Sequence, residues 1–351
     1  MVFMHQGKTD ENNPMKQILY NADKTLDDAD VFYIYDLDKP VPTGRDLLVK
    51  IEAVSVNPVD TKIRARSAGK DRDICLGWDA AGIVEATGND VTLFKQGDRV
   101  YYAGDITRPG TNATYQLVDE RIVGQQPATL SAEQAAALPL TSITAYEALF
   151  ARMKIDPLKD KDKTLLIIGA AGGVGSIAIQ LAKKLGQLQV IATASRDETV
   201  EWCKSLGADH VINHHQSMRE QLVANRLSEP DYILCLNDTD HYYDIMADLI
   251  APQGLICTVV DTRQPHDVSV LKNKSAGLVW EFMFTRAMYH TADMISQHEL
   301  LNEIAEYIDR GDIRTTLNTV LGEMHPDSIR EAHRLLESGK SIGKTVLRGM
   351  N

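Results

Sequence analysis

A glycine-rich turn is the segment of this chain whose residue types and spacing point most clearly to chemistry. The apolar run Thr164–Ile168 leads into a turn over residues 169–175, in which Ala170, Gly172 and Gly175 match the spacing of a dinucleotide-binding motif. The first position makes a tight turn, the second lets a diphosphate approach the backbone, and the third lets the following helix pack closely. The free N–H groups at the helix start face the anion. The predicted contacts are Ala171, Gly172, Gly173, Val174 and Gly175.

The residues after the next predicted strand indicate which dinucleotide binds. NAD-binding proteins usually carry an Asp or Glu there to hold the ribose diol, whereas this chain has Ala194, Ser195 and Arg196. A guanidinium can make charge-assisted hydrogen bonds to a 2′-phosphate, each worth about 1.5–3 kcal/mol, enough for roughly 10–100-fold preference. A solvated surface charge is the alternative for Arg196, and Asp197 is expected to begin the next helix. We predict NADPH as the coenzyme, with Ser195 and Arg196 among its contacts.

Alternating strands and helices are expected to position this turn. Beyond residue 131 the pattern predicts strands over 164–168, 189–193, 210–212, 232–236 and 255–260. It predicts helices over 131–138, 143–153, 174–185, 198–206 and 243–250. Such alternation predicts an α/β fold with a doubly wound parallel sheet covered on both faces. Before residue 127, short β-branched runs broken by Gly, Pro and Asp are typical of a compact, mostly β domain.

The domain organisation follows from these patterns. The tail after residue 290 predicts a helix over 296–310, a strand over 316–320, a helix over 326–337 and a strand over 345–347. Its strands need a sheet to join, so we expect the tail to return to the first domain. The predicted division is a substrate domain over 15–137 plus 290–351, and a dinucleotide-binding domain over 138–289. The polar residues 1–14 do not have the apolar stretch of a signal peptide and are interpreted as a disordered extension or a tag.

Composition narrows the classes of partner. The net charge of −12 would repel the phosphate backbone of a nucleic acid, so we expect no nucleic-acid partner. No apolar run approaches the ~18 residues of a membrane span, so we expect no membrane partner. The four cysteines are far apart and are expected to be buried thiols in a reducing compartment, which favours a cytoplasmic protein. They are Cys75, Cys203, Cys235 and Cys257.

Several short segments carry a family resemblance: residues 54–60, 77–82, 137–139, 144–146, 169–175, 206–209 and 343–344. Together these motifs resemble the medium-chain dehydrogenase/reductase superfamily, and specifically its zinc-free, quinone oxidoreductase-like branch. The resemblance covers residue 15 to the C-terminus, and the sequence is similar to sequences labelled zinc-type alcohol dehydrogenase-like. The resemblance implies a Rossmann domain plus a mostly β, GroES-like substrate domain.

The label zinc-type conflicts with the residues present. Zinc-dependent members place a Cys after the third strand and a Gly-His-Glu triplet, but here Asn57 stands at the first position and Gly77-Trp78-Asp79 at the second. No histidine occurs between His5 and His210. Catalytic zinc needs three N, S or O ligands around an open position, which Cys75, Asp60 and Asp79 would supply poorly. We therefore expect no metal, with Asp60 and Asp79 as hydrogen-bond acceptors that hold loops.

The resemblance also implies residues near the reacting atoms. Asn57 is expected beside the nicotinamide, where its amide could bind the carboxamide or a substrate oxygen; an Asx turn before Pro58 is the alternative. Lys62 stands where relatives often carry Tyr. It could be an oxyanion partner or a phosphate contact, or it could be an uninvolved surface lysine. Thr144 is expected near the nicotinamide ribose, or else as a hydroxyl that caps its own helix. These three residues, Asn57, Lys62 and Thr144, are the catalytic candidates.

Further coenzyme contacts and an interface are implied in the same way. The remaining predicted contacts are His214 near the adenine phosphate, Asn237 and Val259 at strand ends, and Lys344. Relatives commonly dimerise through a sheet edge, placed here at residues 255–260, so a homodimer is expected. An aromatic group over residues 280–289 could wall an apolar pocket, pack at the dimer interface or, as we favour, join the core. It consists of Trp280, Phe282, Phe284 and Tyr289.

Without a Lewis acid, ionising an alcohol is difficult, whereas reducing a polarised acceptor mainly requires positioning. The sequence therefore predicts a zinc-independent, NADPH-dependent reductase of quinones or α,β-unsaturated carbonyls, acting on a small apolar, electron-poor substrate. The alternatives are an enoyl-thioester reductase of the same fold and a non-catalytic NADPH-binding sensor.

Overall fold

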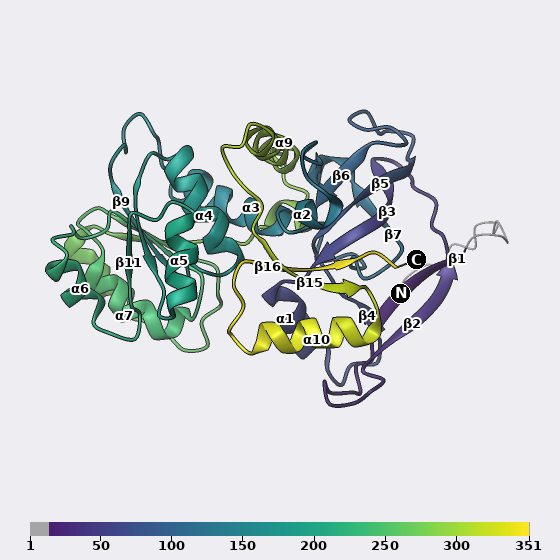
Figure 1. The fold of residues 1–351 in the computed structure, drawn as a ribbon, viewed down its shortest axis with the longest axis horizontal. Helices are drawn as coiled ribbons and strands as arrows, with labels where there is room; N and C mark the ends of the chain where they lie inside the picture. Colours follow the sequence, from purple (N-terminus) through teal and green to yellow (C-terminus); the bar gives the residue numbers. More distant parts are fainter. Residues whose placement is uncertain (1–13, 351) are drawn as a thin grey trace.

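The computed structural model describes residues 14–350 of the chain, which form two β-sheet regions joined side by side (Figure 1). The extension predicted over residues 1–14 lies outside the described residues except for Pro14, which begins strand β1 (Pro14–Tyr20). Among residues 14–350, no helix combines the length and apolar character needed to cross a bilayer.

The first region is a mostly antiparallel sheet built from both ends of the chain. Its strands follow the order β15, β16, β3, β5, β6 and β8, and β7 also pairs with β3. Residue Val346 of β16 lies opposite Ser55 of β3, so the C-terminal strands complete a sheet that the N-terminal half begins. The bounds are β3 (Asp46–Ser55), β5 (Ala80–Thr87), β6 (Arg99–Tyr102), β7 (Tyr115–Asp119), β8 (Val123–Gln125), β15 (Leu317–Glu323) and β16 (Lys344–Arg348). A smaller sheet holds β2 (Phe32–Asp38), β1 and β4 (Ile74–Cys75).

The second region is a parallel sheet with the strand order β11, β10, β9, β12, β13 and β14. The strands are β9 (Thr164–Ile168), β10 (Gln189–Thr193), β11 (His210–Ile212), β12 (Tyr232–Cys235), β13 (Leu255–Thr258) and β14 (Gly277–Trp280). All five residues of β9 are buried, as expected of a parallel strand covered on both faces. The connecting helices are α4 (Gly173–Lys184), α5 (Asp197–Ser205), α6 (Met218–Ala224) and α7 (Thr239–Leu249). The predicted fold class, a Rossmann domain with a GroES-like domain, is confirmed.

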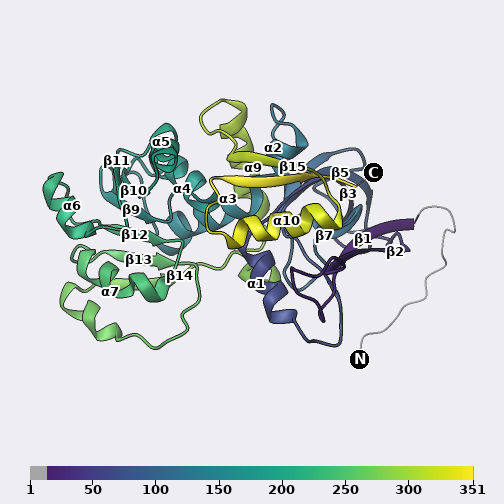
Figure 2. The same cartoon turned by 60° about the horizontal axis from the view of Figure 1, so that its bottom comes forward.

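Helices from distant parts of the chain meet where the two regions join. Helix α1 (Pro58–Ser67) and helix α10 (Pro326–Glu337) lie side by side (Figure 2). The Nη1 atom of Arg64 on α1 lies 3.1 Å from the Nδ1 atom of His333 on α10. The remaining helices are α2 (Ala132–Ala136), α3 (Pro139–Tyr146), α8 (Thr285–Met288) and α9 (Ser296–Asp309), with 3₁₀ turns at Glu120–Ile122 and Val268–Lys274 and a π-helical turn at Glu147–Arg152.

Several predicted boundaries were wrong for identifiable reasons. Helix α7 begins four residues before the predicted start at residue 243, because the Asp238 side chain accepts the N–H of His241 and caps it earlier. The helix expected from residue 143 starts at Pro139, a residue that favours the first helical turn, and it becomes π-helical after Tyr146. Helix α6 and strand β14 were not predicted.

The unpredicted strand β14 changes the position of the sheet edge. Residues 255–260 were expected at the edge, but Leu255–Thr258 pairs with β12 on one side and β14 on the other. The edge strand is therefore β14, and the homodimer itself stays a prediction. The preference for core packing of the aromatic group was correct only for Phe284, which is 2% exposed; Trp280, Phe282 and Tyr289 are 47%, 46% and 71% exposed.

Candidate active site

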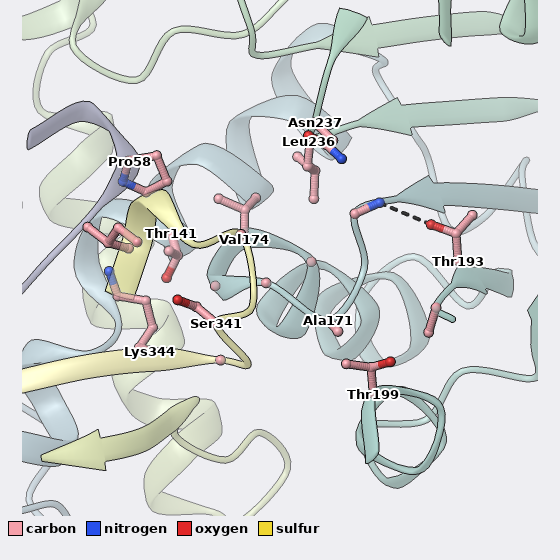
Figure 3. Close-up of a pocket in the computed structure, with 18 of the residues that line it drawn as sticks. Pro58, Thr141, Ala171, Val174, Thr193, Thr199, Leu236, Asn237, Ser341 and Lys344 are labelled. Atoms are coloured by element: carbon pink, nitrogen blue, oxygen red, sulfur yellow. Dashed lines mark hydrogen bonds between the residues drawn. The ribbon is translucent and has the colours of Figure 1, made fainter. Parts of the chain in front are cut away.

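A cleft of about 590 Å³ opens at the carboxyl ends of the parallel strands, where α/β sheets bind their ligands. Both regions line it: the loop after β3, the start of α3 and the C-terminal loop on one side, and the Gly turn with the ends of β10, β11 and β12 on the other. In Figure 3, Val174, Ser341 and Lys344 come from α4, the C-terminal loop and β16, and surround the same space. The cleft is thus a junction of segments that are far apart in the sequence.

The Gly turn has the geometry that a diphosphate requires. Gly169 has φ +83°, so this residue makes the tight turn that the sequence analysis assigned to Ala170. A Cβ on Gly175 would lie 2.3 Å from the carbonyl oxygen of Ala170, which is why the third position must be Gly. A Cβ on Gly172 would meet no other protein atom closer than 3.5 Å, so space remains beside this backbone. The backbone N–H of Gly169 donates to Thr193 Oγ1 at 3.1 Å and ties the turn to β10 (Figure 3).

The C-terminal loop folds over the Gly turn. The N–H of Gly343 donates to the carbonyl oxygen of Ala171 at 2.9 Å, which fixes the loop against the Gly turn. Arg196 donates from Nη2 to the carbonyl oxygen of Lys340 at 3.1 Å and from Nη1 to Glu198 Oε1 at 2.6 Å. The half-exposed guanidinium therefore lines the cleft but is already engaged. Since a guanidinium has five N–H donors, Arg196 keeps donors for a 2′-phosphate while it holds Glu198 and Lys340 O.

A buried polar centre lies under the same cleft and contains Asn57, Asp79 and Lys344. All three are buried: Asn57 is 1% exposed, Asp79 0% and Lys344 4%. The Lys344 ammonium donates to Val56 O at 2.7 Å and to Asn57 Oδ1, and lies 3.2 Å from Asp79 Oδ2. Asn57 Nδ2 donates to Asp79 Oδ2 at 2.9 Å. Asp79 Oδ1 accepts the N–H of Leu140 at 2.8 Å, at the start of α3.

These contacts leave little donor capacity for a ligand. An ammonium has three hydrogens, and those of Lys344 are directed to Val56, Asn57 and Asp79. The Asn57 amide group is directed to Asp79 and, at 3.4 Å, to Ser55 O. Lys344 therefore lines the cleft with its stem, and Asn57 can offer a further contact only through its Oδ1 atom. The expected donation from the Asn57 amide to a substrate is not available in this arrangement.

Burial dominates the protonation of this centre. It raises the pKa of Asp79 to about 6, against the opposing effect of Lys344, and it lowers the pKa of Lys344. Burial also raises the pKa of Asp60 to about 7. Asp60 Oδ2 accepts the N–H of Asn57 at 2.9 Å, while its Oδ1 atom has no hydrogen-bond partner. Asp60 and Asp79 thus hold loops as acceptors, as the sequence analysis expected.

Most of the predicted coenzyme contacts line this cleft. They are Ala171, Gly172, Gly173, Val174, Gly175, Ser195, Arg196, His214, Asn237 and Lys344. The prediction for Val259 was wrong, since this residue does not line the cleft. Strand β13 ends one residue earlier, at Thr258, and the chain then turns towards Thr239, whose hydroxyl donates to Val260 O.

Of the three catalytic candidates, only Asn57 lines the cleft. Lys62 is exposed on α1 and lies outside the lining. The hydroxyl of Thr144 donates to Leu140 O at 2.8 Å within its own helix. Two residues of α3 line the cleft, Leu140 and the hydroxyl-bearing Thr141, which the sequence analysis missed. Its spacing of three residues from Thr144, one helical turn, was the available signal.

Replacing Asp60 with asparagine is expected to remove a pH dependence of stability. The pKa of Asp60 is about 7 in the folded chain, against an ordinary 3.8. The folded chain therefore binds more protons between about pH 4 and pH 7, so this contribution to stability is present at low pH and lost as pH rises. In urea unfolding, the wild type should lose about 1–2 kcal/mol more than D60N between about pH 5.5 and pH 7.5. Equal losses in the two proteins would show that Asp60 is ionised throughout.

Comparison with known proteins places this cleft in a family. Residues 43–132 match the family model of the alcohol dehydrogenase GroES-like domain, and residues 206–347 match that of the zinc-binding dehydrogenases. A zinc-type alcohol dehydrogenase-like protein of Staphylococcus epidermidis is 44% identical over 335 residues, covering 95% of this chain and 99% of the relative. A 2-methylene-furan-3-one reductase of Solanum lycopersicum is 31% identical, covering 86% of this chain and 71% of the relative.

Solved structures give the same answer. A candidate zinc-dependent alcohol dehydrogenase of Rhizobium etli CFN 42 is 47% identical with a TM-score of 0.91, covering 96% of this chain and 99% of that one. The quinone oxidoreductase of Coxiella burnetii is 26% identical with a TM-score of 0.78, covering 96% and 99%. The chain is therefore a member of the medium-chain dehydrogenase/reductase superfamily of oxidoreductases.

Proposed function

We propose that this protein reduces quinones or α,β-unsaturated carbonyl compounds with NADPH and without zinc. The observation that carries the proposal is the contrast between the two halves of the cleft. The Gly turn keeps the space that a dinucleotide requires. Asn57 and Asp79, which by the resemblance stand in the two motifs that supply the metal site of zinc-dependent members, are bonded to Lys344 instead.

The side chains around Asn57 do not fit a zinc ion. Among residues 14–350, no group of three or more His, Cys, Asp or Glu side chains is placed to hold a metal. The Cys75 thiol faces backbone oxygens, including Gly110 O at 3.4 Å, and burial raises its pKa to about 12, so it is not a thiolate ligand. The Lys344 ammonium already supplies the positive charge beside Asp79.

A nicotinamide coenzyme fits the cleft better. The backbone of residues 172–175 would hold its diphosphate, and Ser195 with Arg196 would face the 2′-position of the adenosine ribose. When bound, the reduced coenzyme supplies a hydride. Leu140, Val56 and Pro58 line the cleft next to Asn57 and would exclude water from this end of it.

This arrangement suits an acceptor that is already polarised. In a conjugated enone, hydride adds at the β-carbon, the electron pair of the alkene moves towards the carbonyl oxygen, and a proton from water completes the saturated product. The cleft then needs to hold the acceptor against the coenzyme rather than to ionise a hydroxyl. The Solanum relative is named for an enone substrate and the Coxiella relative for a quinone, and both acceptors have this electronic character.

Coenzyme oxidation with a panel of acceptors tests the proposal. Quinones, enones, enoyl thioesters and simple carbonyls would each be supplied with NADPH or NADH, and alcohols with the oxidised coenzymes. We expect turnover of quinones or enones, a roughly 10–100-fold preference for NADPH, and no change after treatment with a chelator. Turnover of enoyl thioesters alone would identify a different reductase, and loss of activity on chelation would reject the zinc-free mechanism.

A further inference from the structure

Two neighbouring histidines line the same cleft as Arg196. His214 and His215 follow β11, and β11 runs parallel to β10, with Ile212 opposite Thr193. The N–H of Ala194 also donates to Ile212 O at 3.0 Å. Because parallel neighbours end at the same edge of a sheet, the pair and Arg196 project from adjacent strand ends into one end of the cleft.

The turn that carries the histidines is held firmly. The N–H of His215 donates to Asn213 Oδ1 at 2.9 Å. The backbone of Asn213 is bonded in both directions to the side chain of Gln221 on α6, at 2.8 Å each. The two imidazole rings lie 4.3 Å apart, centroid to centroid. The backbone that carries the pair is therefore fixed, with the His214 side chain half-buried and the His215 side chain exposed.

The charges around this pair favour an anion. Arg196, from the junction of β10 and α5, brings a guanidinium to this end of the cleft, and its Nη2 atom donates to the carbonyl oxygen of the exposed Lys340 in the C-terminal loop. Glu198 on α5 is paired with Arg196. Gln221, from α6, is neutral. In the part of the chain that the structure describes, neither imidazole has a carboxylate partner, so nothing on the protein compensates protonation of the pair.

From this geometry we infer that His214 and His215 determine coenzyme selectivity by taking up protons when they bind the 2′-phosphate, so that preference for NADPH over NADH grows as pH falls. The inference rests on the proposed use of NADPH and adds a proton-linked determinant to it.

The physical basis is linkage between proton and phosphate binding. Burial, and secondarily the charge of His215, lowers the pKa of His214, so the free His214 imidazole favours its neutral form. A phosphate monoester carries a charge of about −1.5 to −2 at that pH. Placed against the imidazoles it favours their charged form, so binding and proton uptake reinforce each other. NADH has a hydroxyl group at this position and gains nothing from protonation.

The test is direct binding, independent of turnover. Dissociation constants for NADPH and NADH would be measured by calorimetry between about pH 8 and pH 6.5, where the phosphate keeps most of its charge. The ratio of the NADH dissociation constant to the NADPH dissociation constant should rise about 5- to 30-fold as pH falls over this range, because each proton bound with the phosphate changes the ratio by up to one decade per pH unit. Repeating the titration in buffers of different ionisation enthalpy should reveal proton uptake with NADPH only.

Three variants separate the contributions. The double substitution His214→Asn with His215→Asn should flatten the pH dependence and abolish proton uptake. Arg196→Leu should weaken NADPH binding at every pH but keep the slope. His325→Asn is the matched control: His325 accepts the N–H of Asp327 at the start of α10, a cap that asparagine can replace, so this variant should behave as the wild type.

The outcomes distinguish the two proposals. A stable NADPH preference that does not change with pH, or an unchanged slope in the double variant, would overturn the histidine inference and leave NADPH use intact. Equal affinity for NADPH and NADH at every pH would overturn the proposed coenzyme itself.

Discussion

Replacing Gly172 with valine is expected to weaken coenzyme binding by on the order of 100-fold without lowering the stability of the coenzyme-free protein. The Gly172 backbone is extended, with φ −74° and ψ −178°, a conformation that valine adopts easily. A Cβ there would approach no other protein atom closer than 3.5 Å, so the protein itself tolerates it. The added methyl groups would occupy the space through which a diphosphate reaches the N–H groups at the start of α4.

The comparison variant is Gly175→Val. Its Cβ would lie 2.3 Å from Ala170 O and 2.5 Å from Ala170 Cα, both backbone atoms that cannot move aside. This variant should lose coenzyme binding and several degrees of melting temperature together. Calorimetric binding and thermal unfolding without coenzyme would be measured on both. If G172V bound NADPH as tightly as the wild type, the diphosphate would not lie at this turn.

Replacing Lys344 with methionine is expected to cost about 3–5 kcal/mol of stability, because it leaves a buried carboxylate without its cation. Asp79 would keep its contacts to Leu140 and Asn57, but Val56 O and Asn57 Oδ1 would lose their donor. Without the ammonium, Asp79 is accommodated only when protonated. Since a raised carboxyl pKa means stability is lost as pH rises, the deficit should be larger at about pH 8 than at about pH 5.

A matched pair of variants isolates this effect. Lys340→Met removes an exposed lysine from the neighbouring loop and should change stability by about 0.5 kcal/mol or less. The double variant with Lys344→Met and Asp79→Asn should be at least about 1 kcal/mol more stable than the single Lys344 variant, since the unpaired charge is gone. Additive effects in urea unfolding would contradict a direct pairing of Lys344 with Asp79.

The sequence was sufficient for the parts of this protein that depend on local pattern. The Gly turn lies between a buried strand and a helix, and both neighbours were visible as apolar periodicity, so the turn that lines the cleft was located correctly. Strand β14 was not visible because Gly277–Trp280 is short and only partly buried, with no alternating pattern. The sheet edge was therefore placed one strand too early.

The catalytic candidates show what a sequence cannot predict, namely which distant side chains already bond to each other. Lys344 and Asn57 are 287 residues apart, and only the fold reveals that their polar groups satisfy each other. A sequence motif can place Asn57 near the coenzyme, but it cannot show that the amide is already occupied by Asp79. Thr144 was named because the resemblance implied it, and the resemblance does not show that Thr141, one helical turn earlier, is the threonine that lines the cleft.

The most direct test of the zinc-free reductase is the fate of the hydride. Protein treated with a chelator and shown to be metal-free would be given an enone and NADPH deuterated at C4 of the nicotinamide, with the product examined by NMR. We predict a saturated ketone that carries deuterium at the former β-carbon. An allylic alcohol with deuterium at the carbonyl carbon, or product only after zinc is restored, would contradict the account.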